Sequence, residues 1–269
     1  MQYRVNGVEL HVEQNGQGDL SLVFLHYYGG SLRTWGKITD VLKEEYHCIA
    51  YDQRGWGDSE KSAASYTIKD LADDAQALIR ELGLKRYVII GHSMGGKAAQ
   101  LLASRQPDGL EALILVAPSP PTPQDMPQEM RKAMVQFYDN REGAEIALSN
   151  IALLPLEQNV REMVLEDMQK SAPMARAAWP EIAMLEDISA EVMHIEVPTL
   201  VLAGESDPVD RLETLYSELL PRIPQAELRV ISRTGHLSPL EVPDQISAEI
   251  SNFLAKLEMS GLNRSKDAR

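Results

Sequence analysis

One segment of the chain carries a serine in a setting that favours nucleophilic chemistry. It is the pentapeptide GHSMG at residues 91–95, which follows an apolar run at 87–90 and opens an alanine-rich stretch. The glycines two residues before and two residues after Ser93 permit a turn so tight that the serine takes a strained backbone conformation and projects its hydroxyl. The following helix would direct its positive end toward developing negative charge. A Gly/Ser loop that merely joins strand to helix is the alternative, but this context favours a nucleophile.

The longer segment GHSMGGK at 91–97 resembles the nucleophile elbow of many bacterial and mitochondrial α/β-hydrolase esterases. The resemblance covers nearly the whole chain, from LVFLH at 22–26 to the Gly235-His236 pair, and is weakest at 118–193. It implies the α/β-hydrolase fold, and it implies that Ser93 attacks a carbonyl carbon.

The same resemblance places an acid and a base downstream of Ser93. The family carries its acid at the end of a strand, where Asp207 lies, and its histidine before the last helix, where His236 lies. Glu205 and Asp210 are near enough to compete, but Asp207 fits the spacing best. If each residue is considered alone, the simpler interpretation is that Asp207 is an aspartate of a surface turn and that His236 is a loop histidine without a catalytic role. The order Ser…Asp…His is, however, the order of this fold. His236 is then expected to act as the base and Asp207 as the orienting acid.

A second family feature is the oxyanion hole. In the family, a strand ending in His-Gly-X supplies one of its amides at X, and the corresponding run here is HYYGG at 26–30. The N–H of Tyr28 is therefore expected to join that of Met94. Tyr27 replaces the usual glycine, which leaves the choice between Tyr27 and Tyr28 open and is expected to narrow the acyl side of the pocket. For His26 we expect a buried structural role that braces the loop.

The elements that must position these residues alternate between strands and helices. Apolar runs occur at 20–25, 47–51, 87–90, 112–117, 199–203 and 226–231, with helical spacing between most of them and a last helix near 243–257. This alternation predicts βαβ units and an α/β fold with a mostly parallel central sheet flanked by helices. The pair Asn6-Gly7 predicts a hairpin at the start, and Thr67 with Asp70 resembles a helix capping pair.

The alternation stops after the sixth strand, where prolines cluster (Pro118, Pro120, Pro121, Pro123 and Pro127). The residues that follow have an almost entirely helical pattern. We therefore expect a helical cap at 118–193, inserted into a hydrolase core made of 1–117 and 194–259 and lying over the C-terminal edge of its sheet. Residues 260–269 are polar and are expected to form a flexible tail.

Methionines are concentrated in this predicted cap, which holds eight of the eleven. Met126, Met130 and Met134 recur at helical spacing and therefore share a face. Flexible thioethers suit the roof of an adaptable apolar pocket, although such a stripe could equally pack the cap onto the sheet. We expect Met130, Met134 and Trp179, together with Tyr27, to contact the substrate.

The charge balance narrows the class of partner. Forty acidic against 26 basic residues give a formal net charge of −14, which disfavours nucleic acids and anionic membranes. The single cysteine, Cys48, cannot form an internal disulfide, and the N-terminal residues show no secretory signal, so a cytoplasmic protein is expected. None of the six histidines lies at metal-ligand spacing from carboxylates, so we expect no metal and no organic cofactor. The expected partner is a small-molecule substrate, bound by a monomer or homodimer.

These features predict a serine hydrolase that cleaves a small to medium carboxylic ester through an acyl-enzyme intermediate on Ser93. A serine rather than an aspartate at this position argues against a dehalogenase or an epoxide hydrolase. Cofactor-free haloperoxidase-type chemistry and C–C bond hydrolysis use the same three residues and stay open as alternatives. A ligand-binding signalling protein with slow residual turnover is the non-enzymatic alternative, and tight binding with near-single turnover would distinguish it.

Overall fold

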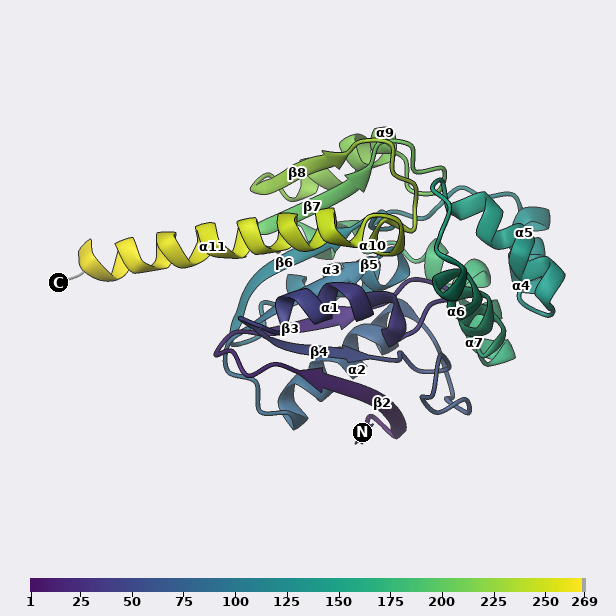
Figure 1. The fold of residues 1–269 in the computed structure, drawn as a ribbon, viewed down its shortest axis with the longest axis horizontal. Helices are drawn as coiled ribbons and strands as arrows, with labels where there is room; N and C mark the ends of the chain where they lie inside the picture. Colours follow the sequence, from purple (N-terminus) through teal and green to yellow (C-terminus); the bar gives the residue numbers. More distant parts are fainter. Residues whose placement is uncertain (268–269) are drawn as a thin grey trace.

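The fold, seen in a computed structural model that describes residues 1–267, is built around an eight-stranded sheet with helices on both faces (Figure 1). The strand order is β1-β2-β4-β3-β5-β6-β7-β8. The antiparallel pairs are β1 with β2 and β2 with β4, and all later neighbours are parallel, as predicted. The strands are β1 (Gln2–Val5), β2 (Val8–Asn15), β3 (Ser21–Leu25), β4 (His47–Tyr51), β5 (Tyr87–His92), β6 (Leu110–Val116), β7 (Thr199–Gly204) and β8 (Ala226–Ile231).

Local sequence signals account for the start of the chain and for its clearest helix. Asn6 and Gly7 join β1 to β2 with φ values of +47° and +81°, the conformation that this pair favours in a tight hairpin. Helix α2 (Ile68–Glu81) begins with a capping box in which Thr67 Oγ1 accepts the Asp70 N–H and the Asp70 carboxylate accepts the Thr67 N–H. Aspartate thus replaces the more usual Glu or Gln, and both predictions are confirmed.

The central strands are buried on both faces, so their side chains alternate between two apolar layers. On β5, Val88 and Ile90 pack in the layer beneath α1 (Gly36–Leu42) and α11 (Pro243–Asp267), while Ile89 packs beneath α2 and α3 (Met94–Ser104). Figure 1 shows α1 and α11 on the near face of the sheet and α2 and α3 on the far face. Among the described residues, no helix is both long and apolar enough to cross a membrane.

The predicted helical cap follows β6 and lies beyond the carboxyl ends of the strands (Figure 1). Its helices are α4 (Gln128–Phe137), α5 (Arg141–Ile151), α6 (Gln158–Gln169) and α7 (Pro173–Glu181), followed by the short η2 (Ala183–Leu185) and α8 (Ser189–Val192). The last of these, α8, packs against α3 of the core. Three short helices, α9 (Leu212–Thr214), η3 (Leu215–Leu219) and η4 (Leu220–Arg222), connect β7 to β8, and α10 (Ser238–Glu241) precedes α11.

A buried lysine on α3 ties both ends of the cap to the core. Lys97 Nζ donates to the Thr122 carbonyl at 3.3 Å near the start of the cap, and to the carbonyls of Met184 (3.4 Å) and Glu186 (2.6 Å) near its end. Burial lowers the pKa of Lys97 to about 8. Both connections of the inserted cap are therefore anchored to the helix that starts at the nucleophile turn.

The C-terminal boundary differs from the sequence prediction. Helix α11 extends to Asp267, so residues 260–267 continue the helix that was expected to end near residue 257. It projects past the sheet on the side away from the cap (Figure 1). The last two positions of the predicted tail, 268–269, lie outside the described residues.

Candidate active site

Ser93 occupies the tight turn between β5 and α3. Its φ of +51° and ψ of −115° lie in a region that non-glycine residues rarely adopt, and such strain persists only where the surroundings impose it. Strand β5 brings the serine to the carboxyl edge of the sheet, and α3 begins at the next residue, Met94, which is buried. The predicted strand–turn–helix setting is therefore confirmed.

Close packing requires the two glycines of this turn. A Cβ on Gly95 would lie 2.5 Å from the His26 carbonyl oxygen, and a Cβ on Gly91 would lie 2.5 Å from the Gly95 carbonyl oxygen. Both neighbours are backbone atoms, which no side-chain rotation can move away. The turn therefore packs directly against the segment after β3, and this contact brings Ser93 close to residues 26–28.

The structure brings together the three residues that the sequence singled out. His236 Nε2 lies 2.9 Å from Ser93 Oγ, and His236 Nδ1 lies 2.9 Å from Asp207 Oδ2. All three side chains are buried. The His236 main chain is held by two further bonds: its carbonyl accepts from the ring of His92 at 2.8 Å, and its N–H donates to the Ile151 carbonyl at 3.1 Å. The imidazole is thus placed by both the core and the cap.

Of the three acids near the end of β7, Asp207 is the one that hydrogen-bonds His236. Its other oxygen, Oδ1, accepts the N–H groups of Val209 and Asp210 at 2.8 and 3.1 Å, which fixes the carboxylate in the loop. Glu205 instead accepts the N–H of Arg233 at 2.8 Å. The two oxygens of Asp207 are therefore divided between the imidazole and the backbone.

Asp210 is a second buried carboxylate beside the imidazole. Its Oδ2 lies 3.9 Å from His236 Nδ1 and 3.3 Å from the Ser119 hydroxyl, and its Oδ1 accepts from Gln124 Nε2 at 2.9 Å. Burial raises the pKa of Asp210 to about 7, and the neighbouring Asp207 adds to this shift against the opposing effect of His236. Burial disfavours the imidazolium, but the nearby carboxylates, Asp207 first, outweigh it and raise the pKa of His236 above its usual range.

The loop after β3 is braced by His26, which is fully buried. The backbone N–H of Gln53 donates to His26 Nε2 at 3.1 Å, so Nδ1 carries the ring proton and donates to the Tyr27 carbonyl at 2.8 Å. Burial lowers the pKa of His26 to about 4, which keeps the ring neutral. A turn with the Gly30 N–H bonded to the Tyr27 carbonyl at 3.0 Å completes the loop and places Tyr28 at its tip.

A cavity of about 1130 Å³ lies between this loop, the Ser93 turn and the cap. Both Ser93 and His236 open onto it. The lining includes all four residues predicted to contact the substrate, which are Tyr27, Met130, Met134 and Trp179. Tyr28 also lines the cavity. Other residues of the lining were not singled out from the sequence, among them Tyr138, Asn150 and Thr214.

The methionine stripe lines this cavity, and two of its members also pack against the core. No residue of α4 is fully buried. Met130 is 56% exposed, and Met126 and Met134 are only partly buried, yet all three line the cavity. Both interpretations left open by the sequence therefore apply: all three methionines line the cavity, and Met126 and Met134 also pack against the core.

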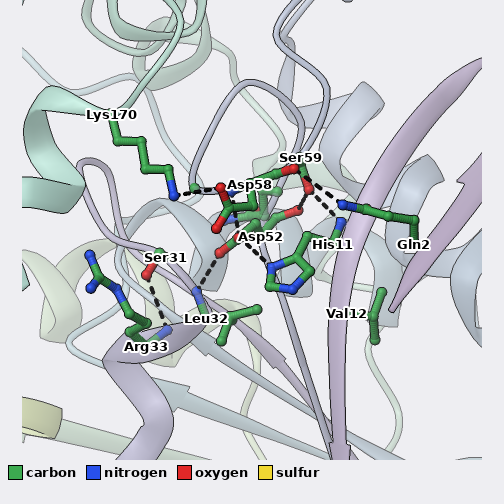
Figure 2. A network of polar contacts seen from close by, with 12 residues as sticks. Gln2, His11, Val12, Ser31, Leu32, Arg33, Asp52, Asp58, Ser59 and Lys170 are labelled. Carbon is green, nitrogen blue, oxygen red and sulfur yellow. Dashed lines mark hydrogen bonds and ion pairs between the residues drawn. The ribbon is translucent and has the colours of Figure 1, made fainter.

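The structure contains a cluster of one histidine and two carboxylates. The expectation that no histidine lies at metal-ligand spacing from carboxylates was therefore wrong. Potential ligand atoms of His11, Asp52 and Asp58 all lie within 4.8 Å of one another. Local spacing missed the cluster because the antiparallel pairing of β2 with β4 brings His11 beside Asp52, which the Asp58 N–H contacts from the turn after β4. Asp52 accepts the N–H groups of Leu32 and Asp58, both at 2.7 Å, and Asp58 pairs with Lys170 of the cap at 2.5 Å (Figure 2). Through Asp58 the cluster contacts the cap, and the expected absence of a metal stays a prediction.

Comparison with known proteins agrees with this architecture. A model of the "Alpha/beta hydrolase family" matches residues 22–249. The chain belongs to the alpha/beta hydrolase family. Its relatives and structural neighbours include several hydrolases, and the chain is a hydrolase enzyme of this family.

Three similar proteins illustrate the range of the family. An esterase from Thermogutta terrifontis is 27% identical with a TM-score of 0.80, over 95% of this chain and 97% of that one. The enol-lactonase from Burkholderia xenovorans LB400 shares the fold with a TM-score of 0.84 at 24% identity, over 95% and 100% of the two chains. A putative non-heme chloroperoxidase from Synechocystis sp. is 25% identical over 263 residues, 92% of this chain and 95% of the relative.

Proposed function

We propose that this hydrolase cleaves small to medium, uncharged carboxylic esters, with Ser93 as nucleophile, His236 as general base and Asp207 as the orienting acid. The observation that carries the proposal is the chain of two 2.9 Å contacts linking Ser93, His236 and Asp207 at the wall of a large cavity. A nucleophile and base within hydrogen-bond reach, with the base oriented by a third group, is the arrangement that activates a hydroxyl.

The proposed reaction has two steps. Ser93 Oγ attacks the ester carbonyl while His236 Nε2 takes its proton, and the tetrahedral oxyanion is held by the N–H groups of Tyr28 and Met94. The C–O bond to the alcohol then breaks, His236 returns the proton to the departing alcohol, and an acyl-enzyme remains on Ser93. Water repeats the sequence, with His236 as its base, and releases the acid.

The cavity supports the substrate class. Aromatic and methionine side chains form much of its lining, including Tyr27, Tyr138 and Met134, and its volume of about 1130 Å³ lies just above the range of about 300–1,000 Å³ usual for ligand pockets. Asp125, Asp210 and Glu218 also line it, against Arg211 as the single Lys or Arg in the described lining. This balance of charge favours uncharged substrates over carboxylate-bearing ones.

Turnover of p-nitrophenyl esters from acetate to decanoate tests the proposal. We expect turnover of roughly 1–10³ s⁻¹, with an optimum at acyl chains of roughly four to eight carbons set by the pocket. Rapid quenching and mass spectrometry of peptides should find the acyl group on Ser93. A chain that turns over none of these esters would lead us to abandon the ester proposal.

The similarity to a putative non-heme chloroperoxidase favours one second candidate, cofactor-free perhydrolysis. In that reaction hydrogen peroxide replaces water in attack on the acyl-enzyme and releases a peracid. Peracid formation from a short carboxylic acid, at a rate above ester hydrolysis, would favour this candidate. Hydrolysis of a vinylogous diketone would instead indicate C–C bond cleavage.

The pH dependence of the reaction should report on Asp210. Only the neutral form of His236 can accept the Ser93 proton, so kcat/KM should rise with pH through the pKa of His236. Negative charge at Asp210 favours the imidazolium and raises that pKa. We therefore expect Asp210→Asn to move the rising limb of the profile to lower pH by about one unit.

The other charged and titratable groups around His236 and Asp210 stay unchanged in the Asp210→Asn variant. Asp207, Glu241 and the ring of His92 also face His236, and Lys97 contributes to the field at Asp210. A matched control is Glu218→Gln, which removes a cavity-lining carboxylate that pairs with Arg222 and should leave the limb in place. Profiles that coincide for the native enzyme and Asp210→Asn would contradict the assignment.

The proposed reaction uses only protein groups and water, so it requires no cofactor. The expectations of a monomer or homodimer, of a cytoplasmic location, and of no nucleic-acid or membrane partner stay predictions.

A further inference from the structure

The side chain of Tyr28 is enclosed by aromatic rings from both the core and the cap. Its ring centroid lies 5.3 Å from Trp56 in an edge-to-face arrangement, 5.0 Å from Tyr138 in a stacked one, and 6.4 Å from Trp179, also stacked. Trp56 follows β4 in the core, whereas Trp179 is in α7 and Tyr138 directly follows α4. The residue proposed to supply an oxyanion amide is therefore held in part by the cap.

Two hydrogen bonds connect the same residue to the cap. The Tyr28 hydroxyl donates to the Arg176 carbonyl at 2.9 Å, and the Tyr138 hydroxyl donates to the Tyr28 carbonyl at 3.2 Å. Tyr138 is 4% exposed, and burial raises the pKa of its phenol, so the hydroxyl keeps the proton that it donates. Both the side chain and the backbone of Tyr28 are thus bonded to cap residues.

Contact between Tyr138 and the loop backbone is close enough to require glycine at the next position. Gly29 has φ of +93°, and a Cβ there would lie 2.5 Å from the Tyr138 hydroxyl and 2.8 Å from its ring. The Tyr138 ring therefore lies directly on the main chain of residues 28–29. A shift of this ring toward the loop would be transmitted to the backbone beside it, because no gap separates the ring from Gly29.

Placement of this backbone matters because an oxyanion donor acts only over a narrow range of distance, about 2.7–3.1 Å from the developing charge. A displacement of about 1 Å in a catalytic geometry can cost on the order of 10²-fold in rate. We propose that Tyr138 is a positioning residue which, from the cap, holds the Tyr28 amide in the oxyanion hole. The inference rests on the proposed function, and it makes the cap part of the catalytic geometry as well as the pocket wall.

Removal of one hydroxyl tests the proposal. Tyr138→Phe keeps the stacked ring but loses the bond to the Tyr28 carbonyl. We expect kcat for the best p-nitrophenyl ester to fall roughly 5- to 50-fold, a part of the loss typical for a whole oxyanion donor, with KM changed less than about twofold because the hydroxyl bonds the loop and not the substrate. Tyr28→Phe, which loses the bond to Arg176, should act in the same direction.

A matched control is Tyr66→Phe. Tyr66 is another buried tyrosine whose hydroxyl donates to a backbone carbonyl, that of Lys61, at 2.8 Å, and its variant should keep kcat within about twofold. An inhibitor readout separates positioning from general loosening. A trifluoromethyl ketone, which forms an oxyanion adduct with a serine, should bind Tyr138→Phe more weakly by the factor lost in kcat, while the unreactive alcohol analogue binds unchanged.

The outcomes separate this inference from the proposed function. If the native enzyme hydrolyses esters and Tyr138→Phe and Tyr28→Phe match it in kcat and in affinity for the ketone, the positioning role of Tyr138 is wrong and the ester proposal stands. A loss confined to KM would also overturn the positioning role. Absence of turnover in the native enzyme would overturn both.

Discussion

Replacement of Ser93 by alanine is expected to lower kcat for p-nitrophenyl esters by about 10⁴- to 10⁶-fold. The change removes the one atom that attacks the carbonyl and leaves His236, at 2.9 Å in the native enzyme, with no proton to accept. The residual rate should still exceed that of buffer by roughly 10³-fold, because binding and the oxyanion donors remain. Steady-state assays at a saturating ester concentration measure this difference.

Ser104→Ala is a suitable control because it changes a second serine of the same segment. Ser104 ends helix α3, and its hydroxyl donates to the Leu101 carbonyl at 2.9 Å. Its variant should keep native kcat. Retention of more than about a tenth of native activity by Ser93→Ala would exclude Ser93 as the nucleophile, since a triad without its nucleophile loses several orders of magnitude.

Much of the site could be predicted because its signals are local. Ser93 lies in a short motif with a strand before and a helix after it, and Asp207 and His236 each follow a strand at positions that the family resemblance supplies. The alternation of apolar runs was sufficient for a mostly parallel sheet, and the proline cluster after the sixth strand marked the start of the cap. Each of these signals occupies a few neighbouring residues.

What could not be predicted depends on contacts between distant segments. Tyr138 follows the end of α4, and no local motif marks it. Its proposed role depends on stacking on Tyr28, which lies 110 positions earlier in the chain. Asp210 was recognised only as a competitor of Asp207, because its distance from the imidazole arises from the folding of the loop. His11 and Asp52 meet through strand pairing. Such contacts require the register and the packing of whole elements.

Asp74→Ala is expected to lower the free energy of unfolding by about 3 kcal/mol, the lower end of the usual cost of removing one partner from a buried ion pair, because Asp70 Oδ1 still lies 3.5 Å from Arg54 Nη1. Asp74 on α2 accepts two bonds from Arg54, at 2.6 and 2.7 Å, and one from Asn6 at 3.0 Å. The two paired side chains are 2% and 6% exposed. Thermal unfolding should show a midpoint lower by roughly 6–12 °C for a chain of this size.

The reason for this loss can be separated from simple loss of packing. If the cause is that the buried guanidinium of Arg54 loses its main carboxylate partner, then Arg54→Met added to Asp74→Ala should recover part of the stability, because an apolar pair is often no worse than a buried ion pair. Glu111→Ala, which breaks an exposed pair with Arg86, should cost less than about 1 kcal/mol. A double variant no more stable than Asp74→Ala would show that the two side chains stabilise the fold through their packing and not through their charges. Gly55, which follows Arg54 in the chain, accepts the N–H of Ala172 in the cap at 2.7 Å. Because Arg54 is held by Asp74, we expect the contact between cap and core to loosen when Asp74 is lost.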